Sequence, residues 1–351
     1  MTGQDFIDDP LDALARYEEA RSLQGFLDEI PGSLVNRTWS AGTPPRFALQ
    51  LVAPQFGDAV NARIEAVGNR LMQSRVRSPQ LLRTDAGALS LPGPEGWRWR
   101  LLTWIPGRVR HLLTSPQDAE SAGALLAQFH DVLYRSRAEL ELPVSDFHDT
   151  EARLARLQAA LARAGGHAHE GQIRQLGDEI LRRYEAWQGR RTARALEPRP
   201  GHGDLKISNV IFEPHAVRAR ALIDYDTLGL YTLDAELGDA LRSWCNIAGE
   251  DKPRPRFDLA IFDAAIAGYL GTSKTITSAE RGRLVHGFGR ITLELAARFL
   301  TDAVEDCYFD WDAKVAPSRI EHNLLRTQGQ LELARHVAAL RSDLEAIVRR
   351  H

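Results

Sequence analysis

The sequence predicts an α+β protein with two lobes, a small antiparallel-sheet lobe followed by a mostly helical lobe. With 351 residues, the chain is long enough for two domains of ordinary size. Short apolar runs separated by turn residues fill residues 34–105, a pattern typical of antiparallel strands. Longer segments with apolar residues at helical spacing follow. We therefore expect an N-terminal lobe at residues 1–106 and a C-terminal lobe at residues 107–351, with a hinge at Pro106-Gly107.

The N-terminal lobe is expected to begin with a short helix, because Asp9 suits the capping position and Pro10 the first helical position. A second helix has Val60, Ile64 and Val67 at helical spacing. Turn residues at 41–45 connect two strands as a hairpin. The strands are expected at residues 34–39, 46–52, 87–91 and 97–105, and the second helix at residues 56–73.

The C-terminal lobe is expected to consist of long helices interrupted by one short pair of strands. Apolar residues at helical spacing, together with Gly and Pro at the ends of these segments, set the expected boundaries. A loop that leads into the first strand is expected at residues 202–212, and the second strand at residues 221–226. The helices are expected at residues 117–133, 150–164, 171–188, 235–246, 257–270, 278–304 and 320–348.

Composition and charge argue against several classes of protein. The formal net charge of -3 gives no basic field for a nucleic-acid partner. No segment approaches the ~18 apolar residues that a membrane span needs, and acidic residues stand where a signal peptide would be basic. Cys245 and Cys307 are too few for a disulfide framework. We expect a cytoplasmic protein, monomeric or homodimeric, in a reducing compartment.

One polar segment in the C-terminal lobe predicts chemistry. It has the sequence HGDLKISN at residues 202–209, and IDYDT follows at residues 223–227 after a short apolar stretch. Phosphoryl transfer passes through a transition state whose charge is spread over the γ-phosphoryl oxygens. An enzyme for this reaction therefore has to align the attacking hydroxyl and neutralise negative charge. The segment contains the residue types for both tasks.

Four side chains in this segment have expected roles. Asp204 is the candidate base that accepts the proton of the attacking hydroxyl. Lys206, the first of only four lysines in the sequence, is the candidate cation at the γ-phosphate. Asn209 and Asp224 offer the hard oxygen ligands that Mg²⁺ prefers. The expected reaction therefore uses ATP and Mg²⁺.

The spacing of these residues resembles the catalytic loop and metal-binding strand of protein kinases. It is more similar to the aminoglycoside phosphotransferase and choline kinase superfamily, because Gly203 separates His202 from Asp204. This resemblance implies a bilobal, protein-kinase-like fold. A closer resemblance is to the N-acetylhexosamine 1-kinases, which phosphorylate the anomeric hydroxyl of N-acetylglucosamine and N-acetylgalactosamine. Similar segments occur in the same order at residues 32–38, 47–50, 146–150, 238–242, 298–302, 308–309 and 322–324, with Arg326.

The closer resemblance implies further site residues. Around a sugar acceptor, a planar guanidinium and an aromatic ring are suitable contacts. The implied sugar-binding residues are Asp204, Thr227, Arg298 and Tyr308. The implied nucleotide-binding residues are Gly32, Asn36, Thr38, Gln50 and Glu65.

The sequence departs from most kinases of this fold at one position. They commonly hold the ATP phosphates with a lysine on the third strand, whereas this chain has Gln50 there, as the N-acetylhexosamine 1-kinases also do. Either Arg37 or the metal is a candidate for the missing positive charge, and Glu65 lies where the partner of such a lysine would be.

Several residues have a structural interpretation beside the functional one. Asp226 is either a neighbour of the metal or a turn residue. His202 is expected to pack the loop, and Asp239 to brace the loop by hydrogen bonds. Arg298 could equally form a surface ion pair, and Tyr308 could be a core aromatic residue.

Three other functions stay open. The first is a kinase for another hydroxylated metabolite such as an aminoglycoside, choline or homoserine. A cationic acceptor of this kind would require carboxylates or an aromatic cage in its site. The second is a nucleotide-binding module without catalysis. The third is a metal hydrolase, for which His202 and Asp204 lack further histidine ligands.

Overall fold

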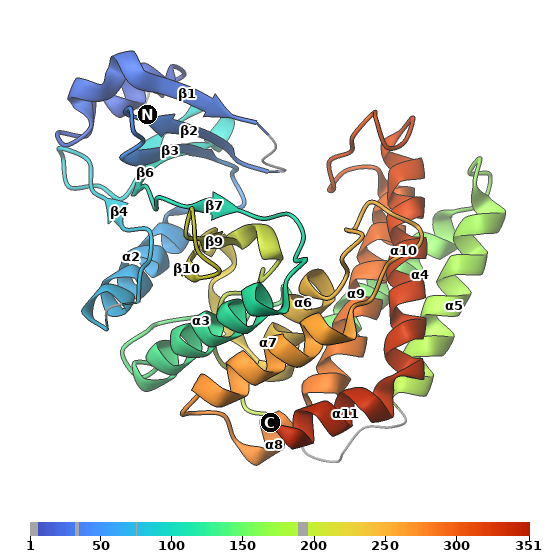
Figure 1. Cartoon of the computed structure of the whole chain (residues 1–351). Helices are drawn as coiled ribbons and strands as arrows, with labels where there is room; N and C mark the ends of the chain where they lie inside the picture. Colours follow the sequence, from blue (N-terminus) through green and yellow to red (C-terminus); the bar gives the residue numbers. More distant parts are fainter. Residues whose placement is uncertain (1–5, 32–34, 75, 189–195) are drawn as a thin grey trace.

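The fold has two parts, as the sequence predicts (Figure 1). This computed structural model describes residues 6–31, 35–74, 76–188 and 196–351. An antiparallel sheet forms the N-terminal part, with strand order β1-β2-β3-β6-β4 and with β5 also paired to β6. These strands are β1 Leu27–Ile30, β2 Arg37–Ala41, β3 Phe47–Val52, β4 Leu81–Leu82, β5 Leu91–Pro92 and β6 Arg98–Thr103.

The two faces of this sheet differ, because side chains alternate along each strand. On one face, Trp39 and Trp99 pack in an apolar cluster with their ring centroids 5.3 Å apart. Residues of helix α1 (Pro10–Leu14) complete this cluster. On the other face, the pairing of β3 with β6 places Gln50 directly opposite Arg100. The sheet therefore presents one apolar face and one face with polar groups at its centre.

Helix α2 (Asp58–Gln73) contributes no residue to the apolar cluster of Trp39 and Trp99. Its buried residues Val60, Ile64, Val67 and Leu71 belong to a second, larger cluster that extends through the helical part of the chain. The helix therefore shares its core with the helical part, although it lies within residues 1–106 in the sequence. The division of the chain at residue 106 stays a prediction.

The helical part is arranged around one long buried helix, α9 (Leu284–Glu305), which packs against α4, α5, α6 and α10. Helices α3 and α7 cross each other closely beside it (Figure 1). Phe262 and Phe288 stack between α7 and α9 with ring centroids 6.1 Å apart. The remaining helices are α3 Pro116–Arg135, α4 Thr150–Arg163, α5 Glu170–Gln188, α6 Leu233–Trp244, α7 Leu259–Thr272, α8 Ser278–Arg281, α10 Arg319–Ala339 and α11 Arg341–Arg350.

Two further small sheets are formed by strands that do not belong to the large sheet. Strands β7 (Arg108–Val109), β9 (Val210–Phe212) and β10 (Ala219–Leu222) form one, in the order β10-β9-β7. Strands β8 (Arg199–Gly201) and β11 (Gly229–Tyr231) form the other. The polar segment at residues 202–209 therefore connects β8 to β9, and the β9–β10 hairpin leads on to Asp224.

Most predicted elements are confirmed, including the Asp9 cap, the strands β3 and β6, and seven helices in their expected places. Other expectations were wrong in detail. The strand expected at residues 87–91 is reduced to Leu91–Pro92, and the one expected at residues 221–226 ends at Leu222, so that Asp224 lies in a turn with φ of 69°. Strands β1, β4, β7, β8 and β11 were not predicted, because very short strands show no clear alternation of apolar and polar residues. The helix expected at residues 278–304 is broken around Gly282, and the one expected at residues 320–348 is broken at Leu340, whose φ/ψ of -92° and 8° are not helical.

Within the described residues, no helix combines the length and apolar character that crossing a membrane requires. The two cysteines are free thiols, Cys245 buried and Cys307 exposed. Burial raises the pKa of the Cys245 thiol well above its ordinary value, so that this thiol stays protonated at neutral pH.

The close crossing of α3 and α7 predicts a stability effect. A Cβ atom at Gly268 would overlap the carbonyl oxygen of Glu120, whereas a Cβ atom at Gly271, in the same helix, would meet nothing within 4 Å. We expect Gly268→Ala to lower the free energy of unfolding by about 1–3 kcal/mol through overpacking. We expect Gly271→Ala to raise it by about 0.5–1 kcal/mol, because alanine favours the helix. Chemical denaturation of both variants measures the difference, and equal effects would contradict the packing described for this crossing.

Candidate active site

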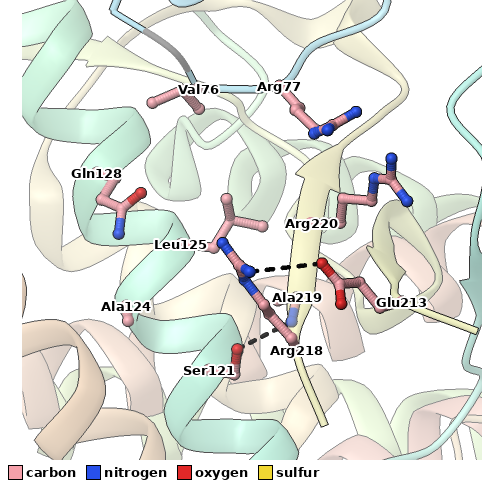
Figure 2. Close-up of a pocket in the computed structure, with 10 residues that line it drawn as sticks. All are labelled: Val76, Arg77, Ser121, Ala124, Leu125, Gln128, Glu213, Arg218, Ala219 and Arg220. Carbon is pink, nitrogen blue, oxygen red and sulfur yellow. Dashed lines mark hydrogen bonds and ion pairs between the residues drawn. The ribbon is translucent and has the colours of Figure 1, made fainter. Parts of the chain in front are cut away.

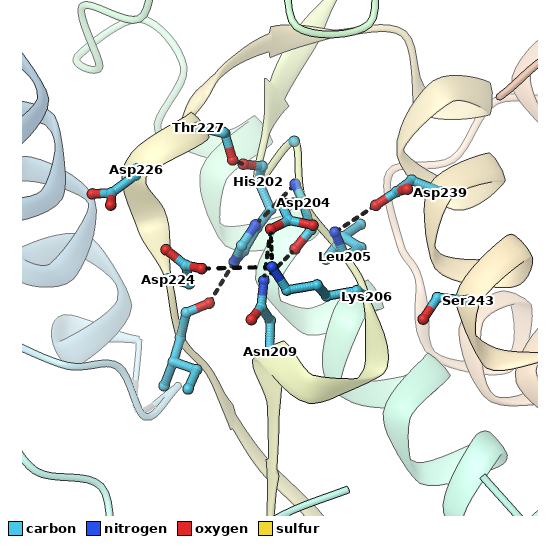
Figure 3. Close-up of polar contacts among 12 residues, drawn as sticks. His202, Asp204, Leu205, Lys206, Asn209, Asp224, Asp226, Thr227, Asp239 and Ser243 are labelled. Atoms are coloured by element: carbon cyan, nitrogen blue, oxygen red, sulfur yellow. Dashed lines mark hydrogen bonds and ion pairs between the residues drawn. The ribbon is translucent and has the colours of Figure 1, made fainter. Parts of the chain in front are cut away.

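The structure brings Asp204, Lys206, Asn209 and Asp224 together (Figure 3). The Lys206 Nζ lies 2.8 Å from Asp204 Oδ2 and 3.9 Å from Asp224 Oδ2. The Asn209 amide nitrogen donates to the carbonyl oxygen of Asp204 at 2.8 Å and to Asp204 Oδ2 at 3.1 Å. These bonds turn the amide nitrogen of Asn209 toward Asp204 and its amide oxygen away from that residue (Figure 3).

The charges in this group shift one another's pKa. Desolvation raises the pKa of Asp204, but the Lys206 ammonium outweighs it and the net pKa falls to about 2. Desolvation lowers the pKa of Lys206, yet Asp204 and Asp224 raise it above its ordinary value. For Asp224, desolvation raises the pKa, Lys206 opposes the rise, and the carboxylates of Asp226 and Asp204 add to it. Negative charge on Asp226 and Asp204 thus disfavours the ionised form of Asp224, and a bound cation would offset that repulsion.

Helix α6 holds the backbone of residues 202–209. Glu236 accepts hydrogen bonds from the backbone N–H groups of His202 and Gly203, both at 2.7 Å. Asp239 accepts from Leu205 N at 2.7 Å, and the Ser243 hydroxyl accepts from Ile207 N at 3.0 Å. These acceptors lie on one face of the helix because they are three and four residues apart. The expected brace at Asp239 is confirmed. Glu236 was not predicted, although its place three residues before Asp239 on a predicted helix was a usable signal.

Two buried histidines fix the same segment. His202 is fully buried, and its Nε2 lies 2.9 Å from the carbonyl oxygen of Ile223, so its expected packing role is confirmed. His148 Nε2 lies 2.8 Å from the carbonyl oxygen of Gly203, and its Nδ1 lies 2.9 Å from Glu294 Oε1. Burial lowers the pKa of His148, but Glu294 outweighs burial and the net pKa is raised. Gly203 has φ of 86°, which suits glycine.

Three of the expected nucleotide-binding residues, Asn36, Thr38 and Gln50, belong to a hydrogen-bond network around the buried guanidinium of Arg100 and the carboxylate of Asp226. Arg100, which is 1% exposed, donates from Nε to Gln50 Oε1 at 2.9 Å and from Nη1 to Asp226 Oδ1 at 2.5 Å. Asn36 donates to the other carboxylate oxygen of Asp226 at 2.7 Å, and Gln50 donates to Thr38 Oγ1 at 3.2 Å. Both carboxylate oxygens of Asp226 therefore accept hydrogen bonds from residues of the N-terminal part. Arg100 was not predicted; its place opposite Gln50 is visible only once the strand register is known.

The other N-terminal candidates lie outside this network. Gly32 falls outside the described residues. Arg37, considered for the missing positive charge, forms an ion pair with Glu29 at 2.9 Å and has 57% of its side chain exposed. Glu65 accepts two hydrogen bonds from Arg83, both at 2.7 Å. The arginine buried beside Gln50 is thus Arg100, while Arg37 and Glu65 each have a surface partner.

The expected acceptor residues are divided between two places. The Thr227 hydroxyl donates to the carbonyl oxygen of His202 at 2.7 Å, so it contributes to the loop. The Arg298 guanidinium lies 4.6 Å from the ring centroid of Phe147, 5.8 Å from that of Tyr308 and 5.6 Å from that of Phe309. No ion pair between Arg298 and a carboxylate occurs within the described parts of the chain. Tyr308 is 50% exposed, so it is not a core residue.

Arg298 contacts the rings of both Tyr308 and Phe147, and Phe147 connects this pair with residues 202–209. This residue directly precedes His148, which contacts the carbonyl oxygen of Gly203. Arg298 and Tyr308 also line a hollow in the surface together with Arg153, Arg156, Asp302 and Glu305. None of the residues 202–209 lines this hollow, and its link to them runs through Phe147 and His148.

Solved structures with the same fold span nearly the whole chain. An aminoglycoside phosphotransferase from Alicyclobacillus acidocaldarius matches with a TM-score of 0.65 and 17% identity, over 97% of this chain and 98% of the other. A choline/ethanolamine kinase family protein from Mesorhizobium loti matches with a TM-score of 0.54 and 17% identity, over 92% and 98%. The amicoumacin kinase hAmiN in complex with AMP-PNP and Ca²⁺ matches with a TM-score of 0.57 and 12% identity, over 91% and 94%.

At these identities the solved structures establish the fold. The family is established by a model of the APH phosphotransferase enzyme family, which matches residues 27–275, well over half of the chain. The match includes the large sheet, the segment at residues 202–209 and Asp224. The chain therefore belongs to the APH phosphotransferase family, and it is a kinase that transfers phosphate to hydroxyl groups.

Proposed function

We propose that this kinase uses ATP and Mg²⁺ to phosphorylate a neutral sugar in the cytoplasm, and that the preferred acceptor is the anomeric hydroxyl of an N-acetylhexosamine. The observation that most supports this proposal is the set of side chains that surround the Arg298 guanidinium. This guanidinium lies among three aromatic rings, without a carboxylate partner among the described residues. One of these rings belongs to Phe147, which directly precedes His148, the residue that contacts the carbonyl oxygen of Gly203.

The geometry supports Asp204 as the group that receives the proton. Its pKa of about 2 keeps it ionised at neutral pH, so it can accept a hydrogen bond from the attacking hydroxyl and direct that oxygen at the γ-phosphorus. A bond forms between the hydroxyl oxygen and phosphorus, the bond from phosphorus to the β–γ bridging oxygen breaks, and the proton passes to Asp204. A weak base is sufficient, because the transition state is loose and positioning dominates. The Lys206 ammonium would place positive charge against the transferred group.

The donor set beside Asp204 fits a divalent metal. The Asn209 amide oxygen and the Asp224 carboxylate are hard oxygen ligands, and the neighbouring carboxylates that raise the pKa of Asp224 would be neutralised by a cation. A bound Mg²⁺ would supply positive charge to the ATP phosphates. The similarity to the amicoumacin kinase, whose complex contains AMP-PNP and Ca²⁺, supports a nucleotide and a divalent ion here.

The acidic groups near Arg298 have partners within the protein. Asp302 accepts from the backbone N–H groups of Cys307, Tyr308 and Phe309 at 2.7–3.0 Å, and from the Asn323 amide at 2.8 Å. Glu305 forms ion pairs with Arg156 and Arg163. A cationic acceptor such as an aminoglycoside would therefore meet arginines instead of available carboxylates.

The aromatic groups also argue against a quaternary ammonium acceptor. A choline-like cation is recognised by a cage of aromatic faces. Here Arg298 occupies the position among Phe147, Tyr308 and Phe309 that such a cation would need. A neutral sugar can instead accept hydrogen bonds from the guanidinium and pack against the exposed ring of Tyr308.

Replacing the proposed base tests the reaction. We expect Asp204→Asn to lower kcat by about 10²–10⁴-fold, because the amide cannot accept the proton. ADP release is measured with Mg²⁺-ATP and a panel of N-acetylglucosamine, N-acetylgalactosamine, glucose, kanamycin, choline and homoserine. The 1-O-methyl glycoside of each responding sugar should be inert. Turnover with kanamycin, choline or homoserine alone would overturn the sugar proposal, and unchanged kcat in the variant would overturn the role of Asp204.

Replacing Arg298 tests the acceptor site separately. We expect Arg298→Met to raise KM for the sugar about 10–100-fold, the loss expected for a hydrogen bond from a charged donor. The KM for ATP should stay unchanged. Arg163→Met is the matched control, because Arg163 pairs with Glu305 at the surface and has 58% of its side chain exposed. Steady-state kinetics with each substrate varied separately distinguish the outcomes, and equal KM values for the sugar in both variants would contradict the proposal.

A further inference from the structure

A second cavity lies away from Asp204, at the far end of the β9–β10 hairpin (Figure 2). It has a volume of about 230 Å³ and lies between the hairpin, helix α3 and the segment that follows α2. Leu125 and Val76 give it an apolar wall, and Gln128 adds an amide. Its space is sufficient for a small molecule with a few polar groups.

Positive charge dominates this cavity. Arg218 and Arg220 line it from the hairpin, and Arg77 lines it from the segment after α2 (Figure 2). Glu213 is the one acidic residue among the described lining residues, and it lies 3.7 Å from Arg218. Neither Arg77 nor Arg220 has an ion pair within the described parts of the chain. The three guanidinium groups repel one another, and the single carboxylate of Glu213 offsets only part of this repulsion. A bound anion would reduce it further.

Arg220 provides a separate observation. Its Nε atom is removed from solvent and has no hydrogen-bond partner among the described residues. Buried donors of this kind normally have an acceptor. Arginine binds the planar or tetrahedral oxygens of carboxylates and phosphates through several N–H groups at once. An oxygen atom of a ligand in the cavity would complete the hydrogen bonding of Arg220.

The position of the cavity connects it to the active site through one short element. Strand β9 begins directly after Asn209, and β10 ends two residues before Asp224. The two strands are paired up to their inner end, where Ile223 N donates to the carbonyl oxygen of Asn209 at 3.0 Å. Arg218 and Arg220 lie at the outer end of the same hairpin, and Arg77 pairs with Ala221 as an isolated bridge. A ligand at the outer end therefore contacts the element that positions both proposed metal ligands.

We propose that this cavity binds a small anion with phosphate or carboxylate groups, and that the bound anion changes the Mg²⁺ dependence of the kinase through the β9–β10 hairpin. The site is separate from the one for ATP and the acceptor. The coupling relies on the proposed metal ligands Asn209 and Asp224, whereas the binding of the anion does not.

Binding is tested with the active site filled. Inorganic phosphate and citrate are titrated in separate arms by calorimetry in the presence of saturating Mg²⁺-ADP, so that Lys206 is not available to them. We expect at least one of the two anions to bind, and the double variant Arg77→Met/Arg220→Met to bind it at least about 10-fold more weakly. Arg182→Met, a change at an exposed position on α5, is the matched control and should bind as the unaltered protein does. No binding of either anion, or equal binding by the double variant, would overturn the proposal.

Coupling is tested by kinetics. The KM for Mg²⁺ is measured with and without the binding anion, using the most active acceptor. We expect a change of about twofold or more in the unaltered protein and none in the double variant. Circular dichroism shows whether the double variant is folded; if it is not, each single variant is used instead. If the anion binds but the KM for Mg²⁺ does not change, the coupling is overturned and only the anion site remains. If neither the unaltered protein nor the variants phosphorylate a sugar, the result counts against the proposed function and not against the anion site.

Discussion

The geometry of the catalytic segment depends on acceptors that helix α6 provides. Residues 202–209 present Asp204 and Asn209 to the active site, so their backbone N–H groups cannot all pair within a helix or sheet. Glu236, Asp239 and Ser243 accept these N–H groups instead. Because the carboxylates are buried, each forms short, charge-assisted bonds that fix the segment firmly. The proposed catalytic side chains are thus oriented by a helix whose own side chains bond the segment through its backbone.

A second buried interaction joins the two parts of the fold. Arg100 and Asn36 reach from the large sheet to the two carboxylate oxygens of Asp226, two residues beyond Asp224. The same arginine donates a hydrogen bond to Gln50 on strand β3. Breaking such a buried pair by removing one partner leaves an uncompensated charge, which costs about 3–5 kcal/mol. The polar face of the sheet is therefore linked to the turn that contains the proposed metal ligand Asp224.

The sequence was most informative where the relevant residues are close along the chain. The grouping of Asp204, Lys206, Asn209 and Asp224 could be predicted because only one hairpin lies between Asn209 and Asp224. The long helices could be predicted because apolar residues recur in them at helical spacing. Arg100 and Glu236 were missed because their importance depends on partners that only the folded chain brings near. The break at Leu340 has no Gly or Pro to mark it. The sugar acceptor stays a prediction, since Arg298 and Tyr308 define a surface but not a substrate.

The order of these elements along the chain has a consequence for biosynthesis. Asp204 to Asp224 are complete before α6 has been translated, and the Glu294 that holds His148 belongs to the still later helix α9 (Figure 1). A nascent polypeptide therefore contains the residues that we propose to bind phosphate and metal well before it contains the groups that arrange them. Enzymatic competence is acquired late in translation, and a chain released before α9 would be catalytically silent.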